Sequence, residues 1–309
     1  MLVLRDNFNE YLNDDTYIAL GSFDGLHMGH MGLIKETMGI ARSNNAKSMV
    51  CTFSNHPLTV INKELAPKLL MDNETKEKIL NDCGIDILNM FQFNKDFMKI
   101  SADDFVINMI RHYNAKGFII GFNYRFGYKN LGDINLLKKL SLKYGFKVIT
   151  VDPVKYNGEL VSSSKIRNVI SEDGDMIKAS KMLTRHFSLK GIIISGKKLG
   201  RTIGFPTINL DYDKSYILPR GGVYYTNVRY DNKVYKGITN IGYNPTTYDY
   251  KLSVETYILD FNKYIYGEEV TIYFINRIRD EVKFDTLDEL VIQLNEDKNY
   301  AKKQNIDII

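Results

Sequence analysis

The chain has few cysteines and little net charge. Only Cys51 and Cys83 occur among 309 residues, and their wide separation excludes a CxxC metal knuckle or redox pair. The absence of a disulfide framework fits a reducing compartment. The net charge is +4 and the lysines are scattered along the chain, so no nucleic-acid partner is expected.

Long apolar runs are also lacking. No stretch has the length and hydrophobicity needed to cross a bilayer, so no membrane partner is expected. The start, MLVLRDNFNEYLNDD, places acidic residues after a short apolar run, unlike the basic flank and longer apolar segment of a signal peptide. We therefore expect a cytoplasmic protein. Its 44% hydrophobic and 25% charged residues are ordinary for a globular fold.

Two domains are expected because 309 residues exceed the usual size of a single hydrophobic core. The first half alternates short β-rich runs with longer amphipathic segments, a pattern typical of a parallel sheet with helical crossovers. Strands are predicted at residues 17–21, 48–53, 86–91, 116–121 and 147–151. The fold class of this half is therefore α/β.

The second half has a different pattern. Runs rich in β-branched and aromatic residues, separated by Gly, Asn, Asp or Pro, predict a small antiparallel barrel. A terminal helix is predicted to follow the capping residue Thr286. We place the domains at residues 1–182 and 183–309, joined by helix rather than by a flexible linker.

The most informative stretch is GSFDGLHMGH, residues 21–30, between the first predicted strand and a helix. Gly21 and Gly25 allow a tight turn close to a ligand. His27 and His30 are three residues apart, so they share one face of the first helical turn. The positive end of that helix suits a polyphosphate. A zinc site and a glycine turn with two incidental histidines remain alternatives, although no third Cys or His follows at metal-ligand spacing.

This stretch resembles the HxGH nucleotidyltransferase superfamily, and most closely the prokaryotic riboflavin kinase/FAD synthetase family, with its pattern GxFDGxHxGH. CTFSNHP from Cys51, GFNYRFGYKNLGD from Gly121 and VSSSKIR from Val161 match in the same order. The resemblance implies a Rossmann-like domain in which His27 and His30 stabilise charge on the ATP phosphates. It also implies a nucleotide-binding role for these residues: Gly21, Ser22, Phe23, Asp24, Gly25 and Asn123.

The serines of VSSSKIR have two interpretations. Serines at a helix start are commonly caps, but three of them before two basic residues also form a phosphate cradle. The resemblance implies a phosphate clamp opposite the histidines, formed by Ser162, Ser163, Ser164 and the catalytic Arg167. His56 is interpreted as a structural loop residue and is left out of the catalytic set.

From Gly191 the sequence GIIISGKKLGRTIGFPTINL resembles the riboflavin kinase signature GxVxxGxxxGRxxGFPTANL of the same family. The loop is not a Walker P-loop, because Arg201 follows Gly200 where Lys-Ser or Lys-Thr would be needed. Taken alone, it would be a solvated hairpin. The resemblance implies that a six-stranded kinase barrel binds phosphates through Gly196, Lys197, Gly200, Arg201 and Gly204.

Thr207 and Asn209 share one face of the strand in PTIN, and such oxygen ligands suit Mg²⁺. The family assigns these two positions to the Mg·ATP site. Glu255, in SVETYILDF, would by itself be an exposed residue, but the family uses it as the base for the terminal ribityl hydroxyl. Departures from the family are Ser54-Asn55 for Glu-Pro, Ser164 for Thr, residues 184–187 for Gly-Arg-Pro-Tyr, and Ile208 for Ala.

The resemblance thus implies a bifunctional enzyme. Riboflavin and ATP would give FMN and ADP, and FMN and ATP would give FAD and pyrophosphate, both with Mg²⁺. A different phosphorylated acceptor is the second hypothesis. The third is a barrel that binds RNA, which would need a clustered basic face. Riboflavin, FMN and ATP are the expected partners, and self-association is left open.

Overall fold

The computed structural model describes residues 1–196, 199–243 and 252–308. The chain forms two compact units. The first unit comprises Met1–Pro67 and Asp72–Ser162, and the second comprises Lys68–Met71 and Ser163–Ile309. This division does not test the predicted functional boundary at residues 182 and 183, which stays a prediction. Among the described residues, no helix is both long and apolar enough to span a membrane.

In its described residues, the first unit contains a six-stranded parallel sheet with the order β1-β4-β3-β2-β5-β6. Its strands are β1 (Leu2–Leu4), β2 (Thr16–Leu20), β3 (Lys47–Phe53), β4 (Ile87–Phe91), β5 (Ala115–Gly121) and β6 (Lys147–Val151). The predicted strands are confirmed to within one residue at each end. The short edge strand β1 was not predicted.

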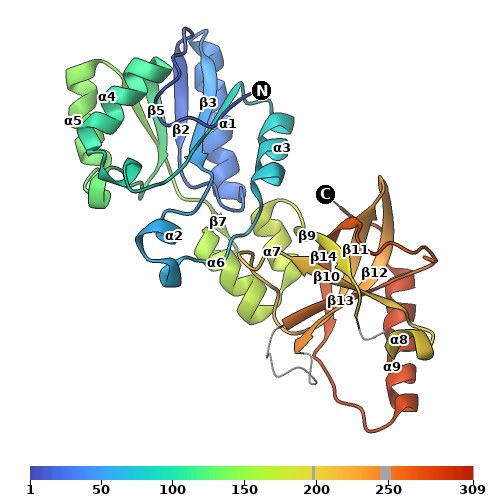
Figure 1. Ribbon diagram of the computed structural model, residues 1–309. Helices are drawn as coiled ribbons and strands as arrows, with labels where there is room; N and C mark the ends of the chain where they lie inside the picture. Colours follow the sequence, from blue (N-terminus) through green and yellow to red (C-terminus); the bar gives the residue numbers. More distant parts are fainter. Residues whose placement is uncertain (197–198, 244–251, 309) are drawn as a thin grey trace. The chain divides into compact units, whose positions relative to one another are not determined.

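The helices of the first unit are α1 (Met28–Ser43), α2 (Leu58–Ile61), α3 (Asn73–Cys83), α4 (Ala102–Tyr113) and α5 (Ile134–Tyr144). Single 3₁₀ turns are η1 (Lys63–Leu65), η2 (Phe97–Lys99) and η3 (Tyr128–Asn130), and a small hairpin is formed by β7 (Lys155–Tyr156) and β8 (Glu159–Leu160). Figure 1 shows α4 and α5 on one face of the sheet and α1 on the other.

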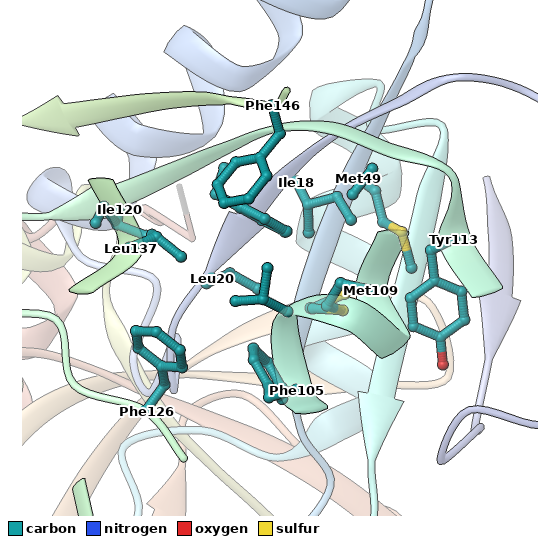
Figure 2. Close-up of a cluster of buried hydrophobic side chains, with 14 of the residues drawn as sticks. Ile18, Leu20, Met49, Phe105, Met109, Tyr113, Ile120, Phe126, Leu137 and Phe146 are labelled. Carbon is teal, nitrogen blue, oxygen red and sulfur yellow. The ribbon is translucent and has the colours of Figure 1, made fainter. Parts of the chain in front are cut away.

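The main core of the first unit lies between the sheet and the α4–α5 layer. Figure 2 shows Phe105 and Met109 of α4 facing Leu20 of β2, with Leu137 and Phe126 close by. The inner strands β2, β3, β4 and β5 are largely buried on both faces, which explains why they are continuous apolar runs rather than alternating ones. This packing makes the sheet a rigid support for the loops at its carboxyl edge.

In its described residues, the second unit contains a closed barrel of six strands in the order β10-β13-β12-β11-β14-β9, with every pairing antiparallel. The strands are β9 (Phe187–Ile194), β10 (Thr207–Tyr212), β11 (Gly222–Tyr230), β12 (Lys233–Tyr243), β13 (Leu252–Ile258) and β14 (Glu269–Arg279). The helical segments are α6 (Ser163–Asn168), the π-helical turn η4 (Val169–Asp173), α7 (Met176–Leu183), α8 (Leu199–Thr202) and α9 (Leu287–Lys303). The predicted barrel and terminal helix are confirmed.

Strand alternation separates the inside of the barrel from its outside. Thr226, Thr239 and Thr256 are fully buried and their hydroxyls form a ladder, at 2.8 Å and 2.9 Å. On the outer face, α9 covers an apolar cluster that includes Tyr225 and Ile238. Helix α9 begins with the predicted cap at Thr286, which forms a capping box with Glu289.

The segment Lys68–Met71, here called the strap, is embedded in the second unit although it precedes α3 in the chain. The Leu69 amide donates to Ser215 O at 2.8 Å, and the Ile217 amide donates to Leu69 O at 3.0 Å. Arg167 Nε donates to Lys68 O at 2.6 Å. The strap therefore adds a short parallel bridge to the segment between β10 and β11.

The departure at residues 184–187 has local structural consequences. Thr184 is the C-cap of α7 with φ of 61°, the left-handed conformation for which glycine is normally preferred. Since the related pattern has Gly there, Thr184 adopts a backbone that its branched side chain disfavours. His186, in place of the family's Pro, lies with Nε2 3.1 Å from Asp307 Oδ2.

Candidate nucleotide sites in the two units

The loop of residues 21–27 leaves the carboxyl end of β2 at the switch point of the sheet. The chain proceeds from β2 to β3 and β4 on one side, and returns to β5 on the other. In such sheets the crevice outside the carboxyl ends at this point is where ligands bind. Leu20 pairs with Ile120, so the loops that follow β2 and β5 emerge side by side.

The loop has an unusual backbone. Phe23, Gly25 and Leu26 have φ values of 47°, 83° and 39°, and both non-glycine side chains are fully buried. Left-handed conformations of bulky residues cost roughly 1–3 kcal/mol each and persist where the surroundings enforce them, often at functional sites. The sequence indicates the loop but not this strain, because no glycine marks the left-handed positions at Phe23 and Leu26.

The two histidines lie together at the start of α1. Their rings stack with centroids 3.6 Å apart and an interplanar angle of 17°. His27 is the N-cap, and its Nδ1 accepts the His30 backbone N–H at 3.4 Å. A neutral His27 ring must then carry its proton on Nε2. A side chain at Gly29 would press on this ring, since a Cβ there would lie 3.2 Å from His27 Cε1.

Asn123 follows β5 and is exposed. Because β5 neighbours β2 in the sheet, Asn123 emerges at the same edge as Gly21. The structure therefore brings Asn123, the glycine loop and the histidines to one edge of the first unit.

The predicted serine clamp is divided between the units. Ser162 ends the last segment of the first unit, whereas Ser163, Ser164 and Arg167 lie on α6 of the second. Ser164 is exposed and Ser163 is half-buried. Arg167 contacts the strap backbone through Lys68. Their action on a nucleotide opposite the histidines stays a prediction.

The stretch around His56 has structural contacts. His56 Nδ1 accepts the Leu58 N–H at 3.2 Å. Asn55 uses both ends of its amide on the backbone of Phe93, donating to the carbonyl at 2.9 Å and accepting from the N–H at 2.9 Å. The departure from Glu-Pro at this point therefore replaces a rigid dipeptide with a side chain that bridges two loops.

On the barrel, strand register aligns the predicted kinase residues. Asn209 of β10 pairs directly with Glu255 of β13, and Thr207 pairs with Tyr257. Paired residues of antiparallel strands project to the same face, with Cβ atoms about 4.5–5.5 Å apart. Asn240 of β12 continues the row on the other side of Glu255. The row lies on the outer face, because the alternate residues of β13 are the buried ones.

Two glycines of the predicted phosphate loop are tightly packed, Gly196 against Asn209 of this row and Gly200 against the backbone of Phe205. A Cβ at Gly196 would lie 2.1 Å from Asn209 Nδ2, and a Cβ at Gly200 would lie 2.1 Å from Phe205 O. Gly204 has a φ of 83°. Lys197 lies outside the described residues, and the backbone of Arg201 belongs to α8.

The donor set on β10 fits Mg²⁺. A hydroxyl and an amide oxygen, from Thr207 and Asn209, project from the same face of one strand, and the Glu255 carboxylate is directly across. Mg²⁺ prefers oxygen ligands and commonly keeps only one or two from the protein, the rest coming from phosphates and water. Ile208, where the family has Ala, pairs with the buried Thr256 and so points to the inner face.

Comparison with known proteins agrees with this architecture. Residues 10–165 match the FAD synthetase family and residues 183–305 match the riboflavin kinase family. A Rossmann-like sheet with a histidine loop at its switch point, followed by a kinase barrel, defines a two-domain enzyme that transfers phosphate-containing groups. The chain belongs to the bifunctional riboflavin kinase/FMN adenylyltransferase family.

The similarity extends over nearly the whole chain. The bifunctional riboflavin kinase/FMN adenylyltransferase of Buchnera aphidicola (strain APS) is 36% identical over 96% of each chain. That of Listeria monocytogenes is 36% identical over 94% of this chain and 92% of its own. A crystal structure described as a macrolide-efflux protein from Streptococcus pneumoniae has a TM-score of 0.88 at 30% identity, covering 98% of this chain and 99% of its own.

Proposed function

We propose that the second unit phosphorylates riboflavin to FMN with ATP, and that the first unit adenylylates FMN to FAD. The observation that carries the proposal is the pairing of Asn209 with Glu255. It aligns a carboxylate with an amide oxygen that is suited to bind Mg²⁺, in the part of the chain that matches riboflavin kinases. The adenylylation step is supported by the stacked rings of His27 and His30 at the switch point, in the part of the chain that matches FAD synthetases.

In the kinase step, Glu255 accepts the proton of the terminal ribityl hydroxyl while that oxygen attacks the γ-phosphorus of ATP. ADP leaves, and FMN carries the new phosphate ester. Thr207 and Asn209 would hold Mg²⁺, which when bound neutralises charge on the ATP phosphates. Because phosphoryl transfer depends chiefly on positioning and charge stabilisation, no further nucleophile from the protein is needed.

In the adenylylation step, a phosphate oxygen of FMN attacks the α-phosphorus of a second ATP, and pyrophosphate leaves. His27 and His30 donate hydrogen bonds to the phosphates as negative charge grows on them. The N–H groups at the start of α1 act in the same direction. Asn123 and the clamp of Ser162 to Ser164 with Arg167 would hold the remaining phosphate oxygens.

The expected partners are therefore ATP, riboflavin and FMN. Dependence on Mg²⁺, a cytoplasmic location and the absence of nucleic-acid binding stay predictions, as does the functional boundary at residues 182 and 183.

The test is a time course of purified protein with riboflavin, ATP and Mg²⁺, in which the flavins are separated by chromatography. A parallel reaction starts from FMN. FMN appearing first and FAD afterwards is the expected result. FAD from FMN without product from riboflavin would contradict the kinase assignment and direct attention to the barrel's departures at residues 184–187. If neither reaction gives a flavin product, the flavin assignment is wrong and another phosphorylated acceptor must be sought.

A further inference from the structure

A buried lysine lies against the loop that joins β2 to α1. Lys76 of α3 is only 5% exposed, and its Nζ donates to the carbonyl oxygen of Ser22 at 3.4 Å. Lysine is almost never buried to this degree unless its charge is compensated. Its position therefore needs an explanation beyond the packing of α3.

The Ser22 carbonyl oxygen has a second side-chain donor. Thr52, on β3, donates to it from Oγ1 at 2.8 Å. Two side chains from different elements thus hold one backbone oxygen. The next residue, Phe23, is the first of the left-handed positions in the loop. Such strained positions persist where their surroundings over-determine them, and this pair of hydrogen bonds acts immediately before the strained residue.

The charges around Lys76 are balanced. Asp24 of the loop is 5% exposed, and Asp72 caps α3 by accepting the Thr75 N–H. Burial lowers the pKa of Lys76, while the carboxylates of Asp24 and Asp72 act to keep its ammonium charged. The lysine is thus linked to the loop on both sides of Phe23, through the backbone of Ser22 and the charge of Asp24.

We propose that Lys76 is a positioning residue for adenylyl transfer, which fixes the peptide between Ser22 and Phe23 so that the loop and the start of α1 face the ATP triphosphate. The inference rests on the proposed function of the first unit. Lys76 acts through Ser22 and needs no contact with the nucleotide. Because the loop is shaped before ATP arrives, loss of Lys76 weakens ATP binding as well as turnover.

The test compares full-length Lys76→Met, Thr52→Val, the double variant and Lys78→Met. Lys78 is exposed on the same helix and is the matched control. For each protein, the kcat of FMN adenylylation and the KM for ATP are measured, with riboflavin kinase activity on the same chain as an internal reference. Lys76→Met is expected to raise the KM for ATP about tenfold or more, the size typical of a lost hydrogen bond to a charged group. Lys78→Met is expected to match wild type.

The double variant tests whether both donors act on the same oxygen. The fold-increase in the KM for ATP in the double variant should be smaller than the product of the fold-increases in the two single variants, because residues that share a partner are not independent. A KM for ATP within threefold of wild type in Lys76→Met would overturn the inference, and so would strictly multiplicative losses. If Lys76→Met does not fold, Thr52→Val decides alone: a severalfold rise in the KM for ATP supports the shared anchor, and an unchanged KM contradicts it.

Calorimetry of ATP binding separates this inference from the proposed function. Wild-type protein with two ATP-binding steps but no FAD formation would refute only adenylyl transfer to FMN. Weakening of one of those two steps in Lys76→Met would still support the positioning role, and two unchanged steps would overturn it.

Discussion

Replacing Gly196 with alanine tests the geometry of the proposed kinase site. An added Cβ would lie 2.1 Å from Nδ2 and 2.8 Å from Cγ of Asn209, whereas nonbonded heavy atoms prefer about 3.5 Å. The backbone of Gly196 is outside the left-handed range, so alanine is opposed only by this contact. Either the loop or the Asn209 amide must therefore move by about 1 Å or more.

A displacement of about 1 Å in a positioned catalytic group can lower the rate about 100-fold, equivalent to about 2.7 kcal/mol in the activation free energy. We expect Gly196→Ala to lower riboflavin kinase kcat/KM by that order and to leave FMN adenylylation unchanged. Ser195→Ala, on the exposed neighbouring residue, is the control for a change in the same loop. The assay is the chromatographic separation of flavins from parallel reactions. Kinase activity within twofold of wild type would refute the reasoning, because the site would then tolerate the overlap with Asn209.

Three other changes have defined outcomes. Glu255→Gln should lower the kinase kcat about 100-fold or more by removing the proposed base, with FAD formation from added FMN as the control; an unchanged kinase rate would exclude that role. Thr184→Gly should relieve the left-handed backbone and stabilise the second unit by about 1 kcal/mol, raising its Tm by about 2–4 °C in calorimetry; a lower Tm would contradict this. Burial acts to raise the pKa of Asp6, but hydrogen bonds led by that from the Tyr113 hydroxyl outweigh it, so the net pKa is lowered. The resulting stability is complete above the unfolded pKa, near pH 4, and is lost as the pH falls through the folded value. Asp6→Asn should therefore lower Tm at pH 7 and make Tm less dependent on pH in the acid range. Equal Tm shifts caused by the substitution at pH 7 and at pH 3 would argue against this role of Asp6.

Sequence patterns predicted the elements whose signals are local. The barrel strands were predictable because their β-branched and aromatic runs alternate, and the terminal helix because Thr286 begins a capping box. Strand β9 begins at Phe187 and continues through Gly191, the first residue of the stretch that resembles the riboflavin kinase signature. Glycine usually interrupts a strand, but a Cβ at Gly191 would lie 2.3 Å from Asp211 O, so here it permits close pairing. Strand β1 has only three residues, too few to show a period.

The sequence indicates candidate site residues where a short loop motif contains the reactive side chains, as in the histidine loop. Lys76 was not predicted because its neighbours on α3 are mostly polar and another lysine lies two positions later. Only the packing of α3 against the loop distinguishes the buried Lys76 from the exposed Lys78. Likewise, the sequence alone could place Asn209 and Glu255 on strands, but their direct pairing depends on barrel register.

Because of the strap, the second folded unit includes residues from the N-terminal half of the chain. Leu69 lies within the stretch that matches FAD synthetases, yet its hydrogen bonds are to Ser215 and Ile217 of the second unit. During synthesis, this segment leaves the ribosome long before Ser215 and Ile217, so its hydrogen bonds to them form only later. A kinase fragment that begins at Ser163 would leave the Ser215 carbonyl and the Ile217 amide to pair with water or with another chain, as an uncovered strand edge does.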